Sequence, residues 1–261
     1  MSDMTVAEIN KAIGGKLAVL FGGHSAEREI SLKSGAAVTA AFQRQGIAVE
    51  AIDVADRGWM QRVETDFSHT FIALHGPGGE DGTVQGALEC LGVTYTGSGV
   101  MASALAMDKF RCKLLWVGMG LTITEPKSAM IADLGSVIVK PACEGSSIGM
   151  SRAASAEELQ SAWQGAQAYG RVFAEQWVVG SEFTVAILNG VALPAIKLET
   201  DAAFYDFNAK YLSNDTRYLC PCGLSERDEL ELSELALAAF TSLGCDGWGR
   251  VDVMRDGEGR F

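Results

Sequence analysis

An alternation of short apolar runs with glycine-containing loops and helical segments restricts the fold of this chain more than any other feature. Residues 16–21 (KLAVLF) have the length and continuous apolar character of a buried parallel strand. After Gly22-Gly23, residues 31–45 show helical periodicity and residues 48–54 read as a second strand. Strand, loop, helix and strand in this order predict the start of an open α/β sheet, which binds ligands beyond the carboxyl ends of its strands.

The loop after the first predicted strand carries a carboxylate at the position where such sheets bind ligands. The loop lacks the G-x-G-x-x-G pattern, so a dinucleotide is not indicated. Glu27 lies just past the strand. Two interpretations stay open for it: a surface glutamate in a salt bridge, or a carboxylate that accepts a substrate ammonium group.

A second glycine-rich loop, residues 75–82 (HGPGGEDG), follows a short strand predicted over 71–74. Many glycines with a histidine and two acids are typical of a loop that lines a site. We expect Glu80 or Asp81 to cap a helix over 83–91, and His75 to face the site.

One helix is predicted over residues 102–118. It contains Lys109, Arg111 and Lys113, and most of its charges are expected to form a solvated face. One lysine could turn inward toward phosphates, but the sequence does not say which.

Residues 137–150 combine a short β-branched strand with a loop of small residues. The strand ends at Lys140, Pro141 stops its regular continuation, and Gly145, Ser146, Ser147 and Gly149 follow. Such a loop lets backbone N–H groups approach an anion closely. Phosphate binding and a plain hairpin loop with a solvated lysine are equally good interpretations of this motif alone.

The last third of the chain places charged residues on several predicted strands and in one long loop. Strands are expected over 172–177 and 182–188, where Glu175 and Glu182 either bracket a base and a ribose or mark the outer faces of a hairpin. The long segment 200–216 has no period and is predicted to be a functional lid.

A further strand is predicted over 248–254, followed by a turn over 255–259 and a return strand. Arg250 and Asp252 share one face of this strand. They are either a salt bridge or, with a phosphate nearby, an oxyanion partner and a Mg²⁺ ligand.

Composition limits the function classes. The formal net charge is −12 and no basic tract occurs, which argues against nucleic acid as a partner. No apolar run is long enough to span a bilayer, and the polar N-terminus does not resemble a signal peptide. The six cysteines form no C-x-x-C pair, so we expect reduced thiols in a cytoplasmic protein.

Six motifs in a fixed order carry a resemblance to a known family. They are HGPGGEDG, TGSGVMASALAMDK, VKPACEGSSIGM, EFTV, FYDFNAKY and GRVDVM. From about Lys16 to the last residue the chain resembles the D-alanine–D-alanine ligases of the ATP-grasp superfamily. The resemblance implies an α/β fold with an N-terminal open parallel α/β subdomain (1–97), followed by a central (98–176) and a C-terminal (177–261) ATP-grasp subdomain.

The same resemblance implies an activity. ATP and Mg²⁺ (or Mn²⁺) would support the joining of two D-alanines through a D-alanyl phosphate, for peptidoglycan precursor synthesis in the cytoplasm, by a homodimer. D-alanine–D-lactate or D-alanine–D-serine ligation is the nearest alternative. A non-catalytic ATP-binding protein without a complete metal site is another.

Site residues follow from the resemblance motif by motif. Lys109 and Lys140 match the two lysines that bind the ATP phosphates, Ser147 a donor in the loop over them, and Lys210 a lysine that reaches the γ-phosphate. The positions that match the adenine and ribose contacts are Glu175, Trp177, Val178 and Glu182.

The substrate residues follow in the same way. Glu27 matches the acceptor of the first substrate's ammonium group, with Ser146 and Tyr211 as its hydrogen-bonding companions. The remaining matches are His75 near the first substrate, Arg250 as the oxyanion partner and Asp252 as a magnesium ligand.

Two departures from the family pattern stand out. Phe207 replaces a tyrosine that is frequent in the family, which removes one hydroxyl from the predicted lid. The family continues past the position of Phe261 with a Glu and an Asn of the metal site and a Gly/Ser segment for the second substrate. We therefore expect the chain to be a fragment of a longer protein.

Overall fold

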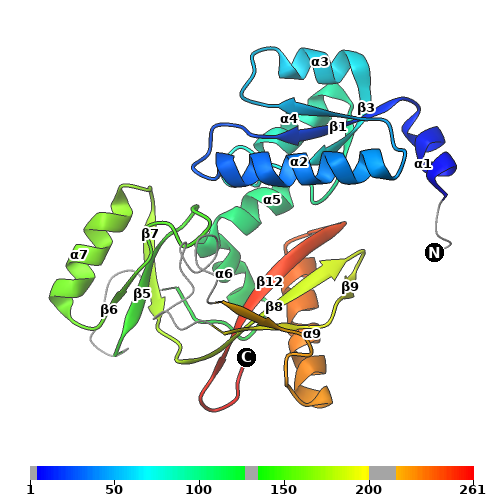
Figure 1. Cartoon of the computed structure of the whole chain (residues 1–261). Coiled ribbons are helices and arrows are strands. Elements are labelled where there is room, and N and C mark those ends of the chain that lie inside the picture. The colour runs from blue at the N-terminus through cyan, green and yellow to red at the C-terminus, as the bar shows by residue number, and fades with distance from the viewer. Residues whose placement is uncertain (1–4, 127–134, 200–215) are drawn as a thin grey trace. The chain divides into compact units, whose positions relative to one another are not determined.

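A computed structural model describes residues 5–126, 135–199 and 216–261 of the chain (Figure 1). The chain divides into two compact units, Met1–Ala104 and Leu105–Phe261. Lys210, Tyr211 and Phe207 of the predicted lid lie outside the described residues.

The first unit contains a parallel sheet, four-stranded in its described part, with the strand order β2-β1-β3-β4. Its strands are β1 (Lys16–Phe21), β2 (Val49–Asp53), β3 (Phe67–Ile72) and β4 (Thr94–Tyr95). Its helices are α1 (Val6–Ile13), α2 (Arg28–Arg44), α3 (Trp59–Asp66), α4 (Thr83–Leu91) and most of α5 (Val100–Met107). The predicted open α/β sheet is therefore confirmed.

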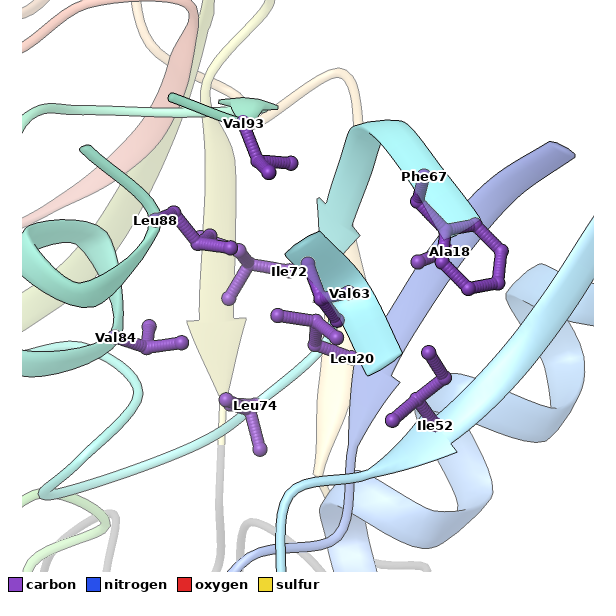
Figure 2. Close-up of a cluster of buried hydrophobic side chains, with 10 residues drawn as sticks. All are labelled: Ala18, Leu20, Ile52, Val63, Phe67, Ile72, Leu74, Val84, Leu88 and Val93. Atoms are coloured by element: carbon purple, nitrogen blue, oxygen red, sulfur yellow. The ribbon is translucent and has the colours of Figure 1, made fainter. Parts of the chain in front are cut away.

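The core of the first unit forms where α3 and α4 pack on the sheet. Figure 2 shows side chains from β1, β3 and these helices pointing toward one another. Leu20 and Leu88 are fully buried, and burial of a side chain of this size contributes about 1.5–3 kcal/mol. The core residues alternate with apolar residues of the opposite sheet face, as expected for a sheet covered on both faces.

The second unit contains two antiparallel sheets. In the described residues the first has the order β6-β5-β7, and α7 packs on it. Its elements are β5 (Val137–Pro141), β6 (Ser151–Ala153), α7 (Ala156–Gln167) and β7 (Val172–Gln176). The face under α7 carries Val137, Val139 and Ala174, so the opposite face carries Ile138, Lys140 and Glu175.

The second sheet of this unit has the order β11-β10-β8-β12, with β9 beside β8, as far as the described residues show. Its strands are β8 (Gly180–Leu188), β9 (Val191–Ala192), β10 (Ile196–Glu199), β11 (Arg217–Leu219) and β12 (Trp248–Asp256). Helix α9 (Glu226–Ser242) packs against it through Leu232, Ala236 and Phe240. Helix α6 (Lys109–Gly118) contacts α9, where the Trp116 indole N–H donates to the Ala239 carbonyl at 3.1 Å.

Several predicted elements differ from the observed ones. The helix predicted over 102–118 is two helices, because Asp108 leaves the helical conformation and its carboxylate accepts the Arg111 N–H at 3.0 Å as the N-cap of α6. The strand predicted over 71–74 is wrong in its bounds, since β3 begins at Phe67. Strand β12 continues to Asp256, two residues beyond its predicted end. The turn therefore begins after Asp256 and not at residue 255.

The hairpin interpretation of residues 172–188 is wrong. Strand β7 pairs with β5 in one sheet, whereas β8 pairs with β9, β10 and β12 in the other. The segment between β7 and β8 therefore links two sheets, and Trp177 and Val178 lie in this link.

Candidate active site

In the first unit, the carboxyl ends of β1 and β3 bring Glu27 close to the His75 loop. Gly22 has a φ of +73°, and a Cβ on it would lie 2.3 Å from Asp53 Oδ1, so only glycine fits this turn after β1. The Ser25 hydroxyl then donates to the His75 carbonyl at 2.7 Å and ties the two loops together.

The Glu27 carboxylate is held inside this pair of loops. Its residue is only 6% exposed, so the expectation of a surface glutamate is wrong. A Cβ on Gly76 would lie 2.8 Å from Glu27 Oε2, which shows how closely the backbone of the His75 loop approaches the carboxylate. Such a buried carboxylate beside a loop edge suits a cationic group of a ligand.

His75 is oriented by one partner on each ring nitrogen. Its Nε2 lies 3.0 Å from the Ser34 hydroxyl of α2, and its Nδ1 lies 3.7 Å from Glu80 Oε1. The nearby Glu80 carboxylate raises the pKa of His75, although burial opposes the shift. Glu80 also accepts the Gly76 N–H at 2.9 Å.

Of the two acids expected to cap the helix, only Asp81 contacts its first turn. Asp81 accepts the N–H of Thr83 at 3.0 Å, at the start of α4, and that of Gly78 at 2.9 Å. Glu80 does not cap the helix; it contacts His75 and the loop backbone instead.

In the second unit, two lysines pair with one buried glutamate, and a third lysine lies near them. Lys140 and Glu175 are diagonal neighbours on paired strands, because Lys140 lies opposite Phe173 and Ile138 opposite Glu175. A diagonal pair of this kind is within reach of long side chains, and Lys140 Nζ contacts Glu175 Oε1. Lys113 Nζ, from α6, lies 2.7 Å from Glu175 Oε2.

The third lysine, Lys109, precedes Lys113 by one helical turn and lies on the same side of α6. Its Nζ donates to backbone carbonyls of the loop after β5, those of Glu144 and Ala142 (3.3 Å) among them. Burial, followed by repulsion from Lys140, lowers the pKa of Lys109 to about 8.

The two lysines that pair with Glu175 outnumber its one carboxylate. Burial alone would raise the pKa of Glu175, yet Lys140 and Lys113 hold it at about 2, so the group is a carboxylate at neutral pH. One buried carboxylate thus pairs with two ammonium groups, while the third lysine, Lys109, lies near Lys140 and near the acidic residues Glu144 and Asp108. A site with this excess of positive charge favours a polyanion.

The loop between β5 and β6 borders this cluster. It is a hairpin loop, as one interpretation expected, but Lys140 is not solvated: its side chain is 19% exposed and paired. Ser146 and Ser147 have φ values of +51° and +60°. Adjacent non-glycine residues in the left-handed region are uncommon, and such backbone is concentrated at ligand-binding loops.

The predicted nucleotide residues lie around the link between the two sheets. Trp177 follows β7 and is half-buried, with the Arg152 guanidinium 5.3 Å from its ring centre. Val178 is half-buried in the same link, and Glu182 lies on β8 opposite Met254 of β12.

Arg250 and Asp252 form the salt bridge that one interpretation expected. Arg250 Nε lies 2.9 Å from Asp252 Oδ1, and the Thr184 hydroxyl donates to the same oxygen at 2.8 Å. Both side chains lie on the sheet face opposite to α9, because Val251 and Val253 pack in the core.

Asp252 is the predicted magnesium ligand, and its surroundings suit one carboxylate ligand of a metal ion, not a complete metal site. Within residues 5–126, 135–199 and 216–261, no group of three His, Cys, Asp or Glu side chains has the geometry of a metal site. Mg²⁺ is commonly held by one or two carboxylates, with phosphate oxygens and water completing its octahedron. The half-exposed Asp252 fits as one such carboxylate beside a bound phosphate.

Sequence reasoning missed four residues of these clusters: Lys113, Thr124, Ser34 and Glu80 as the partner of His75. Lys109 and Lys113 both turn inward, while Arg111 stays exposed. Their spacing of four residues was the available signal, since it puts both on one helix face. Ser146 and Glu27 belong to different units and Tyr211 is not described, so their predicted association stays a prediction.

Comparison with known proteins decides the family. The profile of the D-ala D-ala ligase C-terminus matches residues 124–261, and that of the D-ala D-ala ligase N-terminus matches residues 59–98. A D-alanine–D-alanine ligase of Pseudomonas putida is 52% identical over 259 residues, which cover 95% of this chain and 81% of that protein.

The chain belongs to the D-alanine–D-alanine ligase family.

Solved structures of this family agree with the fold. The D-alanine–D-alanine ligase of Bacillus anthracis complexed with ATP has a TM-score of 0.80 and 26% identity, over 93% of this chain and 82% of that one. The VanG D-Ala:D-Ser ligase of Enterococcus faecalis also has a TM-score of 0.80, with 25% identity over 94% of this chain and 88% of that one. The predicted ATP-grasp fold is therefore confirmed. No helix in the described ranges is long and apolar enough to cross a membrane.

Proposed function

We propose that this protein joins two D-alanines into a dipeptide at the expense of ATP, for peptidoglycan precursor synthesis. The observation that carries the proposal is the pairing of Lys113 and Lys140 with one buried carboxylate, that of Glu175, with Lys109 close to Lys140. The excess positive charge of these lysines suits a triphosphate, and they lie beside a loop of small residues with left-handed backbone. The ligase family supplies the substrate class.

The first chemical step makes a poor electrophile reactive. A carboxylate oxygen of the first D-alanine attacks the γ-phosphorus of ATP, ADP leaves, and a D-alanyl phosphate forms. Such a transfer depends on positioning and on neutralised charge more than on a protein nucleophile. Lys109, Lys140 and Lys210 are the groups proposed to neutralise the phosphates, with Ser147 as a donor from the loop.

The second step forms the amide bond. The amine of the second D-alanine attacks the carbonyl carbon of the acyl phosphate, an oxyanion forms, and phosphate leaves with the electron pair of the broken C–O bond. Arg250 is proposed to stabilise that oxyanion, a role that in other enzymes contributes roughly 3–4 kcal/mol. Exclusion of water by the loop with Ser146 and Ser147 and by the lid with Lys210 would protect the acyl phosphate.

Two further sets of residues complete the proposal. Glu27 accepts the ammonium group of the first D-alanine, with Ser146 and Tyr211 as its companions and His75 nearby. Glu175, Trp177, Val178 and Glu182 contact adenine and ribose. Mg²⁺, or Mn²⁺, would be held by Asp252 together with phosphate oxygens, and it would supply charge neutralisation on the phosphates.

The organisation and setting of the protein are part of the same proposal. We assign substrate binding to residues 1–97, and the two halves of the nucleotide site to 98–176 and 177–261. The separate cores under α7 and α9 support the division of the second unit. We further propose a homodimer that works in the cytoplasm.

Coupled measurement of ADP release with ATP, Mg²⁺ and D-alanine tests the activity. We expect ADP only when D-alanine is present, together with D-alanyl-D-alanine as the product. Tight ATP binding without turnover would instead support a non-catalytic nucleotide-binding protein. Product analysis with D-serine or D-lactate added tests the alternative favoured by the likeness to the D-Ala:D-Ser ligase.

A further inference from the structure

Lys113 differs from Lys140 in the partners that its ammonium group has, and from Lys109 in that one of its three acceptors is a buried carboxylate. Its Nζ lies 2.7 Å from Glu175 Oε2, 2.8 Å from the Thr124 hydroxyl and 3.0 Å from the Thr124 carbonyl. An ammonium group has three protons, so these three acceptors use all of them. A donor used for a ligand would therefore cost Lys113 a contact with Glu175 or Thr124, whereas Lys109 would give up only backbone carbonyls.

Lys140 is held in a different way. It contacts Glu175 Oε1, on the other oxygen of the same carboxylate. Each oxygen of Glu175 thus has its own lysine, and the Thr124 hydroxyl adds a donor to Oε2 at 3.0 Å. Lys140 can leave without disturbing the contacts on Oε2.

Because Glu175 is buried, it matters which of its two lysines stays in contact with it. Only 5% of its side chain is exposed, and a buried carboxylate without a cationic partner is strongly disfavoured. If Lys140 turns to a phosphate, one positive charge must remain on Glu175. Lys113, with 15% of its side chain exposed and all donors engaged, provides that charge.

We infer that Lys113 is a positioning residue that keeps the Glu175 carboxylate charged and in place when Lys140 exchanges it for the phosphates of the nucleotide. The inference rests on the proposed function, because it takes Lys140 as a phosphate ligand. It assigns Lys113 no contact with the nucleotide.

Calorimetric titration of the full chain with ADP and with adenosine, in the presence of Mg²⁺, tests the inference. In Lys113→Met we expect ADP to bind at least about tenfold more weakly. Glu175 would either keep Lys140 away from the phosphates or, if Lys140 leaves, have no cation beside it. Adenosine has no phosphate to attract Lys140, and its affinity is expected to change by less than about threefold. Binding of ADP, but not of adenosine, should also take up protons in this variant, measured in buffers of different ionisation enthalpy.

Three further variants separate this role from a structural one. Lys113→Arg should restore most of the ADP affinity and abolish the proton uptake. In the Glu175→Gln background, Lys113→Met should weaken ADP binding by much less than it does alone, since no carboxylate is stranded. Lys16→Met removes a lysine from an exposed pair with Glu50 and should leave ADP binding unchanged.

The outcomes distinguish the inference from the function it rests on. If the unaltered chain binds neither ADP nor ATP, the proposed function and the inference both fail. If it binds ADP and Lys113→Met binds it equally well, only the inference fails. Weaker binding without proton uptake, and with an undiminished effect in the Glu175→Gln background, would show Lys113 to be a direct phosphate ligand and would also overturn the inference. If Lys113→Met does not fold, the double variant Lys113→Met/Glu175→Gln replaces it, because it leaves no buried carboxylate without a cation. An ADP affinity equal to that of Glu175→Gln supports the positioning role, and a weaker affinity supports direct phosphate binding.

Discussion

The two units hold their charged residues in opposite ways. In the first unit the Glu27 side chain is buried, its backbone N–H donates to the Ser25 hydroxyl, and the adjacent His75 is oriented by Ser34 and Glu80. In the second unit the lysines outnumber the buried carboxylate. The first arrangement suits the cationic end of a small substrate and the second suits a polyanion. Each unit therefore carries the chemistry for one co-substrate of the proposed ligase.

The largest effect on stability is expected at Glu175, the buried carboxylate of the second unit. Glu175→Gln removes the one charge that compensates Lys113 and Lys140, and breaking a buried ion pair typically costs about 3 kcal/mol or more. We expect a loss of about 3 kcal/mol in the free energy of unfolding, measured with urea, that ADP partly restores.

The matched control for Glu175 lies in the first unit. Glu50→Gln removes a carboxylate that pairs with Lys16 and Arg62 at the surface, and exposed pairs contribute about 0.5 kcal/mol. Equal losses in the two variants would contradict the importance assigned to burial in the second unit.

Next in size is the effect expected at Glu27 of the first unit, the residue proposed to accept the ammonium group of the first D-alanine. Glu27→Gln keeps the shape of the side chain but removes its charge, so we expect the KM for D-alanine to rise about 30-fold while the KM for ATP stays the same. Steady-state kinetics with each substrate varied in turn measures both. An unchanged KM for D-alanine would remove Glu27 from the substrate site.

A smaller effect is expected from Asp53, which supports the turn before Glu27. Its carboxylate accepts from Arg28, Gly23 and Ala55, and the Arg28 hydrogen bonds lower its pKa to about 2, although burial opposes the shift. Because the folded-state pKa lies below the ordinary value of 3.8, this stabilisation is present above pH 4 and is lost as the pH falls toward 2.

Asp53→Asn should therefore lower the free energy of unfolding at neutral pH by about 1 kcal/mol. It should also flatten the loss of stability between pH 4 and pH 2, measured by urea unfolding at each pH. A variant with the same acid dependence as the unaltered chain would show that Asp53 is not responsible for it.

The smallest effect concerns the protonation of His75. Glu80 raises its pKa above 6.5, so the stabilisation by this pair is present below the unfolded-state pKa and is lost as the pH rises through the folded-state pKa. Glu80→Gln should lower the midpoint of the His75 titration, followed by NMR of the ring protons. Glu64→Gln, an exposed carboxylate on α3, is the control and should leave that midpoint unchanged. A midpoint that stays the same in Glu80→Gln would contradict the pairing.

Local patterns predicted much of the fold. Strand β1 and helix α4 have the predicted bounds, because a continuous apolar run and a helix between two glycines are short-range signals. The break at Asp108 was missed, since the apolar residues on both sides read as one helix and only the cap geometry separates them. The hairpin interpretation of 172–188 failed because strand partners are chosen by packing between distant segments.

The sequence by itself determined the fold class and the family resemblance. It also placed Glu27 and His75 in loops, Lys109 in a helix, and Lys140 and Glu175 on strands. Only the tertiary structure decided which charges meet. Pairing of β5 with β7 puts Lys140 diagonally across from Glu175, 35 residues away, and the packing of α6 brings Lys113 to the other oxygen. A residue type shows the charge that a side chain carries, but the cost of burying that charge, and hence its function, depends on partners that are distant along the chain.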